Sequence, residues 1–285
     1  MNDVFEQVAE LTRTGGRGVL ATVVEVRGSV PGAVGARMLV HPDGSIHGTV
    51  GGGALEHAVR ERAPEILARG QARLERFDLG ADLDMGCGGF VTVFMEPIGT
   101  VDRLFLFGAG HIAEHLCDMA ARCGFLVVVC DERDELRTAE RFPRATHLSP
   151  AGIAERLSEL EEVGLGDAER VYAMVVTHSH ALDFALVAGL LPRNLAYLGC
   201  IGSRSKRAKL DAHLEAAGFT EEDRGRIRSP AGIKLGGRSP AEIAVSIVAE
   251  LVQKRAARAK AADQAAQDQA AKATTAQDQA AEQGA

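Results

Sequence analysis

Tryptophan is absent from this chain of 285 residues, and aromatic residues make up only 4% of it. Proteins that bind single-stranded nucleic acid stack its bases on aromatic side chains, so this composition argues against that class. Lysine and arginine (32) are outnumbered by aspartate and glutamate (39), which gives a net charge of −7. An acidic chain has no overall electrostatic attraction to nucleic acid or to an anionic membrane surface. We therefore expect neither as a partner.

Long hydrophobic runs and a disulfide framework are also missing. The longest apolar runs, such as Phe125–Cys130 and Val171–Val176, have six residues, far fewer than the ~18 that a membrane-spanning helix requires. The first ten residues, MNDVFEQVAE, lack the basic and apolar regions of a secretory signal. The five cysteines are odd in number and form no CxxC pair. These features are typical of a cytoplasmic protein with reduced thiols.

Glycine, by contrast, is abundant. The chain has 32 glycines, 17 of them within residues 1–100. Hydrophobic residues (46%) and charged residues (25%) are in the usual range for a globular protein. At ~100–200 residues per domain, the length predicts two domains. The glycines indicate that the backbone of the first domain turns tightly or approaches a ligand closely at many points.

Residue patterns predict a different organisation for the two halves of the chain. Residues 1–97 are expected to form a glycine-rich α+β domain with helices over 5–11 and 54–69 and strands over 19–26, 37–40, 46–50, 71–78 and 90–95. The segment 37–50 is a candidate hairpin. Pro64 should kink or divide the second helix, and Gly70 should end it.

Beyond the Pro97–Thr100 boundary, strands alternate with single helices. Strands are expected over 104–107, 125–130, 171–176 and 196–201, and helices over 111–122, 153–162, 182–191, 205–217 and from Ser239 onward. This alternation predicts an α/β domain over 101–255, a Rossmann-like doubly wound parallel sheet. Residues 256–285 are rich in Ala, Gln and Asp and have no apolar periodicity. They are expected to be disordered or to continue the last helix in frayed form.

A glycine turn lies between the first strand and helix of the second domain. Gly108 and Gly110 would let the backbone approach a phosphate, while His111 opens the helix and Ala113 permits close helix–strand packing. Asp131 ends the next strand, where an acidic side chain would accept a hydrogen bond from a ribose hydroxyl. The pattern indicates a binding site for a dinucleotide such as NAD(P). The alternative is a turn of this fold that binds no ligand.

The first domain has its own candidate anion site. Gly51, Gly52 and Gly53 precede a helix, so their N–H groups can form a cradle for an oxyanion. Arg37 could clamp the same anion through two hydrogen bonds. Glu56 lies in the first helical turn, where it either faces the ligand or complements the helix dipole. The alternative is a glycine-rich turn without a ligand.

Cys87 differs from the other four cysteines because it has a glycine on each side, in Met85–Gly89. A thiol without bulky neighbours is accessible, and its thiolate is a soft ligand suited to molybdenum, copper or zinc. The other cysteines lie in apolar helix or strand contexts, where buried and unreactive thiols are the expectation.

Two further polar clusters follow strands of the second domain. His178 and His180, with Asp183 nearby, could bind a metal or carry protons, or Ser179 or Asp183 could simply cap the next helix. Ser203, Arg204 and Lys206 suit a phosphate, or form the solvated start of a helix. The chain contains no GxSxG elbow, HExxH or phosphate-binding-loop lysine motif. We therefore expect neither acyl transfer nor ATP hydrolysis.

Several of these motifs, in this order over residues 18–255, resemble the XdhC/CoxI family of xanthine dehydrogenase accessory proteins. The resemblance rests on VLATVVEVRGSVPGAVGARMLV, DGSIHGTVGGGALE and MGCGGFVTVFMEP in the first domain, and on LFGAGHIA, VVTHSHALD, YLGCIGSRSKRAKL and GGRSPAEIAVSIVAELV in the second. One departure is Ser-Pro-Ala-Gly at 229–232, where the family often has Cys-Pro-x-Gly. The Ala/Gln-rich tail also departs from the family pattern.

The resemblance implies a function that the spacing of residues does not show. Members of the family bind the molybdenum cofactor (molybdopterin), protect it during sulfuration and deliver it to an apo molybdenum hydroxylase such as xanthine dehydrogenase. A cysteine desulfurase is then an expected partner. Whether the chain forms a homodimer is a question that the resemblance leaves undecided. The resemblance also implies that Cys87 lies near molybdenum and that the chain is a chaperone and not an enzyme. The alternative is an NAD(P)-dependent oxidoreductase that uses the Rossmann-like domain.

Overall fold

The structure, a computed structural model, describes residues 4–14, 16–28, 30, 32–78, 89–99, 101–161, 163–165 and 168–283. The chain divides into two compact units, one of residues 1–100 with 262–285 and one of residues 101–261. Among the described residues, none of the helices combines the length and apolar character needed to cross a membrane. The predicted domain boundaries stay predictions, and each unit is described by itself below.

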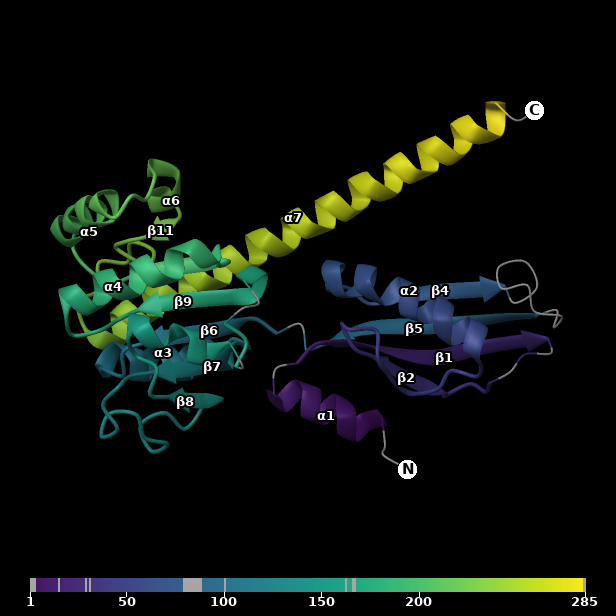
Figure 1. Ribbon diagram of the computed structural model, residues 1–285, viewed down its shortest axis with the longest axis horizontal. Coiled ribbons are helices and arrows are strands. Elements are labelled where there is room, and N and C mark those ends of the chain that lie inside the picture. The colour runs from purple at the N-terminus through teal and green to yellow at the C-terminus, as the bar shows by residue number, and fades with distance from the viewer. Residues whose placement is uncertain are drawn as a thin grey trace. The chain divides into compact units, whose positions relative to one another are not determined.

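The first unit is built on an antiparallel sheet with the strand order β3-β2-β1-β5-β4 (Figure 1). Its elements are α1 (Val4–Thr14), β1 (Gly18–Gly28), β2 (Arg37–Val40), β3 (Ile46–Gly48), α2 (Gly53–Arg69), β4 (Arg73–Asp78) and β5 (Gly89–Ile98). The predicted hairpin is confirmed, because β2 and β3 pair as antiparallel neighbours. The helix α2 is not divided at Pro64, and it ends at Gly70 as predicted.

The core of this unit lies between the sheet and α2. Alternate residues of β1 and β5 point to one face, as the twofold period of a strand requires. The helix contributes a stripe of apolar side chains to the same cluster. Its buried members include Val19, Ala21, Val23, Leu55, Val59, Ala63, Ile66, Val91, Val93 and Met95.

The second unit contains a sheet of six parallel strands in the order β11-β10-β9-β6-β7-β8. The strands are β6 (Arg103–Phe107), β7 (Leu126–Cys130), β8 (His147–Ser149), β9 (Val171–Val175), β10 (Tyr197–Cys200) and β11 (Ile227–Arg228). Numbered along the chain, the order is 3-2-1-4-5-6, which is the order of the Rossmann fold. The predicted fold class is confirmed.

Helices cover both faces of this sheet (Figure 1). They are α3 (His111–Arg122), α4 (His180–Leu190), α5 (Arg204–Ala216), α6 (Glu221–Gly225) and α7 (Pro240–Gln283), with 3-10 turns η1 (Ala154–Leu160), η2 (Ala168–Arg170) and η3 (Leu191–Arg193). Leu104 and Leu106 of β6 pack with α3 and α7, whereas Phe105 and Phe107 pack with α4 and α5. Burial on both faces explains the continuous apolar runs of these strands.

Three segments differ from the prediction or extend it. The α-helix expected over 153–162 is wrong, because the segment forms the 3-10 turn η1, in which Leu157 and Leu160 are both buried. A spacing of three residues suits a 3-10 turn, which has three residues per turn. The short elements β8, β11 and α6 were not predicted. The Ala/Gln-rich segment is described as the C-terminal part of α7, one of the two alternatives that its composition left open.

Candidate functional site

The carboxyl ends of β6 and β9 meet where the strand order of the parallel sheet reverses, which is where ligands bind in open α/β sheets. Gly108 follows β6 with φ 114°. A Cβ atom at this position would lie 2.7 Å from the carbonyl oxygen of Val176, so only glycine fits. Gly110 precedes α3 as its N-cap, and Ala113 is buried against the sheet. His111, the first residue of the helix, is exposed.

Asp131 lies at the end of β7, as predicted, but its carboxylate already accepts hydrogen bonds from protein groups. The backbone N–H of Ala109 donates to it at 2.8 Å, and the Nε and Nη2 atoms of Arg133 donate at 2.9 and 2.8 Å. Burial alone would raise the pKa of Asp131, but these hydrogen bonds outweigh it and hold the pKa below its usual value. The side chain is only 5% exposed. It therefore closes the glycine turn onto the sheet and is not free to bind a ribose.

The cleft at this edge is narrow. It has a volume of about 10 Å³ and is lined by residues that include Gly108, Asp131, Arg133, Thr177 and His178. A space of this size holds about one water molecule. This cleft is therefore much smaller than a nucleotide.

The histidine cluster after β9 is not a metal site of the kind that its composition allowed. His178 and His180 are exposed, whereas Asp183 is fully buried and accepts a hydrogen bond from Thr177 Oγ1 at 2.7 Å. Ser179 caps α4, which was the alternative. Among the described residues, no group of three His, Cys, Asp or Glu side chains could hold a metal ion.

The prediction that Lys206 binds a phosphate at the start of α5 is wrong. Its ammonium is buried, and it donates to the Asp183 carboxylate and, at 2.8 Å, to the carbonyl oxygen of Ile201. Ser203 caps the helix by accepting from the N–H of Lys206. Arg204 is exposed, so of the predicted cationic pair it alone is directed to solvent.

The two glycine segments of the first unit lie against each other. A Cβ atom on Gly32 would be 2.6 Å from the carbonyl oxygen of Val50 and 3.0 Å from Cα of Gly51. Gly52 is the N-cap of α2, and among the described residues no side chain caps the helix there. The N–H groups of its first turn, including that of Gly53, therefore point out of the helix without a side-chain cap. We call the segments 32–35 and 49–53 the glycine cradle.

Arg37 and Glu56 border the glycine cradle in different ways. The Nη1 atom of Arg37 donates to the carbonyl oxygen of Gly35 at 3.1 Å, and its guanidinium stacks 4.9 Å from the ring centre of Phe5. The Oε1 atom of Glu56 accepts from Thr49 Oγ1 at 2.5 Å, and that hydroxyl accepts from the N–H of Gly51 at 3.1 Å. Glu56 is thus linked to the cradle, while Arg37 is engaged by protein groups.

Cys87 lies outside the described residues. Of the other cysteines, Cys117, Cys130 and Cys200 are buried and Cys123 is partly buried. Burial raises the pKa of Cys117 and of Cys200 to about 12, and it raises that of Cys130 as well. These three are the unreactive thiols that the sequence predicted.

Sequence comparison finds a family match within each of the two units. Residues 104–251 match the XdhC Rossmann domain, and residues 11–78 match the XdhC and CoxI family. The chain belongs to the XdhC and CoxI family. The resemblance noted from the motifs is thereby confirmed.

Three relatives in this family illustrate its range. The uncharacterized protein YqeB of Escherichia coli is 32% identical over 88% of this chain. A protein of Bacillus subtilis, described as a probable subunit of xanthine dehydrogenase, is 37% identical over 57% of it. The chain spans 46% of the length of each of these two proteins. The molybdenum cofactor insertion chaperone PaoD of Escherichia coli is 22% identical, and the match covers 88% of both chains.

Among solved structures, the chain is similar to one described as a xanthine dehydrogenase from Bacillus halodurans. The identity is 22%, the TM-score is 0.47, and the match covers 89% of this chain and 96% of the other.

The sequence predicted candidate sites at these glycine turns and strand ends, but it missed which side chains close them. Arg133 and Lys206 were not assigned to carboxylates. Arg133 follows the strand-ending Asp131 by two residues, a spacing that lets both residues share one turn, and this was the available signal. Lys206 stands in a run of basic residues with no visible difference from its neighbours, so its burial had no signal.

Proposed function

We propose that the protein binds the molybdenum cofactor, protects it during sulfuration and delivers it to an apo molybdenum hydroxylase such as xanthine dehydrogenase. The observation that carries the proposal is the glycine cradle, in which the described start of α2 has no side-chain cap and open space lies beside Gly35 and Gly53. Membership of the XdhC and CoxI family supports it. So does the relative named as a molybdenum cofactor insertion chaperone.

The glycine cradle suits the phosphate of molybdopterin. The start of α2 offers N–H donors and the positive end of the helix dipole to an anion. A Cβ atom on Gly35 or on Gly53 would meet no described atom within 4 Å, so a large ligand has room to approach the backbone there. Glu56, tied in place by Thr49, is the acceptor for N–H groups of the pterin ring.

A soft metal such as molybdenum calls for a thiolate ligand. Cys87 is the single cysteine of residues 1–100. Gly89, two positions further along the chain, pairs with Gly28 at the end of β1 that leads into the cradle segment. We therefore assign Cys87 as the thiol nearest to molybdenum. Arg37 borders the same segment and is the cation that can release Gly35 to bind the anion.

The second unit takes part through the exposed polar side chains at the carboxyl edge of its sheet, namely His111, His178, His180, Ser203 and Arg204. We propose that they contact the cofactor or the recipient enzyme. Gly108, Gly110 and Ala113 shape this edge, and Asp131 holds it closed. The chain acts as a chaperone in this account, with a cysteine desulfurase as its second partner.

Metal and pterin analysis tests the proposal. Protein purified anaerobically from a cell that makes the cofactor should contain molybdenum and, after oxidation, fluorescent pterin. Cys87→Ser should lower the molybdenum per protein at least tenfold, because it removes the soft ligand. Cys123→Ser, which changes the partly buried thiol of the other unit, is the matched control and should leave it unchanged. Wild-type protein without molybdenum or pterin would contradict the proposal.

The dinucleotide alternative has less support, because Ala109 and Asp131 satisfy each other and the cleft beside them holds about one water. Calorimetric titration with NAD and with NADP separates the two functions. We expect no saturable binding of either. Saturable binding that Gly110→Trp abolishes would favour an oxidoreductase.

A further inference from the structure

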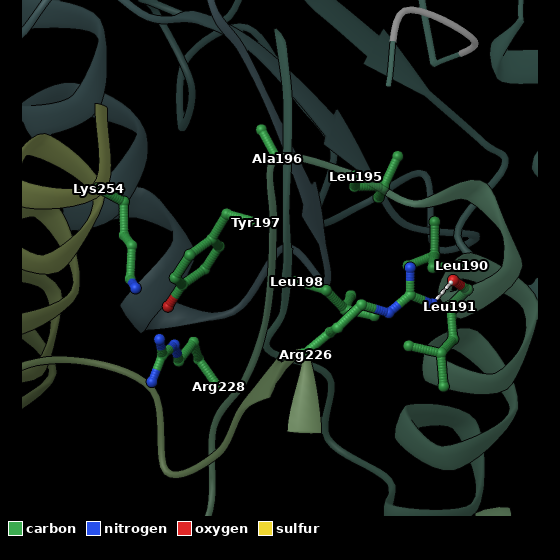
Figure 2. Close-up of a pocket in the computed structure, with 9 residues that line it drawn as sticks. All are labelled: Leu190, Leu191, Leu195, Ala196, Tyr197, Leu198, Arg226, Arg228 and Lys254. Carbon is green, nitrogen blue, oxygen red and sulfur yellow. Dashed lines mark hydrogen bonds between the residues drawn. The ribbon is translucent and has the colours of Figure 1, made fainter. Parts of the chain in front are cut away.

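A cavity of the second unit lies at the amino ends of β10 and β11, the opposite edge of the sheet from the candidate site (Figure 2). Its volume is about 210 Å³, roughly twenty times that of the cleft at the carboxyl edge. Leucines from the end of α4 and from the start of β10 form its apolar wall, including Leu191, Leu195 and Leu198.

All the charged side chains among the described residues that line this cavity are cationic. Figure 2 shows Arg228 and Lys254 on either side of the Tyr197 hydroxyl, with Arg226 against the leucine wall. None of these lining residues carries a carboxylate, although acidic residues outnumber basic ones in the chain as a whole, 39 to 32. A concave surface that carries charge of one sign beside low-dielectric walls concentrates its field and attracts the opposite charge.

Lys254 lacks the partner that its helix position offers. Glu250 lies one turn earlier on α7, the favourable spacing for a Glu–Lys pair. Its Oε2 atom instead accepts from the Tyr197 hydroxyl at 2.7 Å and from the N–H of Gly232 at 2.6 Å. Within the part of the chain that the structure describes, neither Lys254 nor Arg228 has an ion-pair partner.

Arg226 is engaged differently. Its guanidinium donates to the carbonyl oxygen of Leu191 at 2.6 Å and to Asn194 Oδ1 at 2.5 Å. It thereby covers a carbonyl group at the negative end of the helical segment formed by α4 and η3. An anion in the cavity is consequently screened from that helix end, and the charges of Arg228 and Lys254 are left for it.

We propose that this cavity binds a small organic anion, with its carboxylate or phosphate between Arg228 and Lys254 and its apolar body against the leucines. The size and lining fit a ligand of roughly the size of benzoate or phenyl phosphate. The site lies in the second unit alone and does not depend on the molybdenum cofactor.

Calorimetric titration of the full chain with benzoate, phenyl phosphate, benzyl alcohol and inorganic phosphate tests the proposal. Benzoate or phenyl phosphate should bind saturably, and the stronger of the two identifies the head group. Benzyl alcohol lacks the charge, and inorganic phosphate lacks the apolar body, so both should bind at least tenfold more weakly. The double variant Arg228→Gln/Lys254→Gln should weaken binding of the preferred anion at least tenfold, because it removes the two cations that face the cavity.

The variant Lys209→Gln/Lys260→Gln is the matched control, since it removes the same charge from exposed positions of α5 and α7. It should bind the anion as the wild type does. Three results would overturn the proposal: no saturable binding of either aromatic anion, equal binding by the Arg228/Lys254 variant, or an equal loss in the control. Circular dichroism of each variant establishes that it is folded.

Discussion

Asp131 shows how a single carboxylate fixes the glycine turn of the second unit. It joins the end of β7 to the N–H of Ala109 in the turn and to the guanidinium of Arg133. Asp131→Asn keeps one acceptor for Ala109 but removes the charge that holds Arg133. Hydrogen bonds to charged groups contribute roughly 1.5–3 kcal/mol. We expect the variant to lose about that much free energy of unfolding at pH 7, as urea denaturation would measure.

The loss should depend on pH in a definite direction. The hydrogen bonds lower the pKa of the folded Asp131 carboxyl below the usual ~3.9. Its contribution to stability is therefore present above about pH 4 and disappears as the pH falls through the lower folded value. The difference in the free energy of unfolding between wild type and Asp131→Asn should shrink over that range.

Asp118→Asn, which breaks exposed pairs with Arg122 and Arg144, is the control and should lower the free energy of unfolding by less than about 1 kcal/mol. A loss for Asp131→Asn that persisted undiminished at the lowest pH at which the protein stays folded would contradict this explanation.

The sequence predicted the positions of the residues at this edge better than their partners. Gly108, Ala113 and Asp131 were expected near one another because parallel strands bring their carboxyl ends together. That the carboxylate would be occupied by Ala109 and Arg133 depends on the loop after β7, whose path no periodicity specifies. For the same reason the burial of Lys206 could not be predicted from a basic run that is otherwise exposed.

At the scale of elements, a buried ion pair connects four parts of the Rossmann-like unit. The carboxylate of Asp183, on α4, accepts hydrogen bonds from the ammonium of Lys206, on α5, and from the hydroxyl of Thr177, which follows β9. Lys206 also donates to Ile201 after β10. Both side chains are buried, Asp183 at 0% and Lys206 at 7% exposure. The pair therefore joins neighbouring strand ends at the carboxyl edge of the sheet.

Lys206→Met tests this connection. It leaves the Asp183 charge buried with the hydroxyl and N–H of Thr177 as its remaining donors among the described residues, and breaking a buried pair typically costs about 3–5 kcal/mol. We expect a loss of that size in the free energy of unfolding from urea denaturation. The double variant Asp183→Leu/Lys206→Met removes both charges and should recover part of the loss. Single and double variants with additive losses would show that the two residues do not interact.

The elements that the sequence predicted well are those whose burial follows their own period. The helix α3 begins at His111 and ends at Arg122 as expected, since glycines mark its start and its apolar stripe has helical spacing. The strands β8 and β11 have three and two residues. Their hydrogen bonds to β7 and β10 define them, and so short a segment carries no recognisable alternation.

At the scale of the whole molecule, each unit encloses its own apolar core. The clusters of the second unit draw on residues between Leu104 and Val252, and that of the first on residues between Val19 and Met95. A domain with its own core is in principle able to fold alone. The sequence predicted a domain over 101–255, whereas the compact unit extends to residue 261. The difference concerns the last contacts of α7.

Those contacts predict where the second unit can be cut. Arg258 donates to the buried Asp102 carboxylate and to the carbonyl oxygen of Glu169, while Arg255 donates to the carbonyl oxygen of Cys123 at 2.9 Å. A fragment of residues 101–255 keeps Arg255 but leaves Asp102 without Arg258. Because hydrogen bonds to charged groups contribute roughly 1.5–3 kcal/mol, it should be less stable than 101–261 by about that amount.

Urea denaturation of the two fragments measures the difference, and Arg258→Gln in the longer fragment is the matched control. It should lower stability as far as the truncation does, since it removes the same donor to Asp102 with the helix intact. The charge of Arg258 is then what places the boundary of the unit at residue 261. If the fragments are equally stable, the boundary lies at residue 255, as the sequence predicted. If Arg258→Gln is as stable as the unmodified longer fragment while truncation destabilises, the helical backbone of residues 256–261 matters and the ion pair does not.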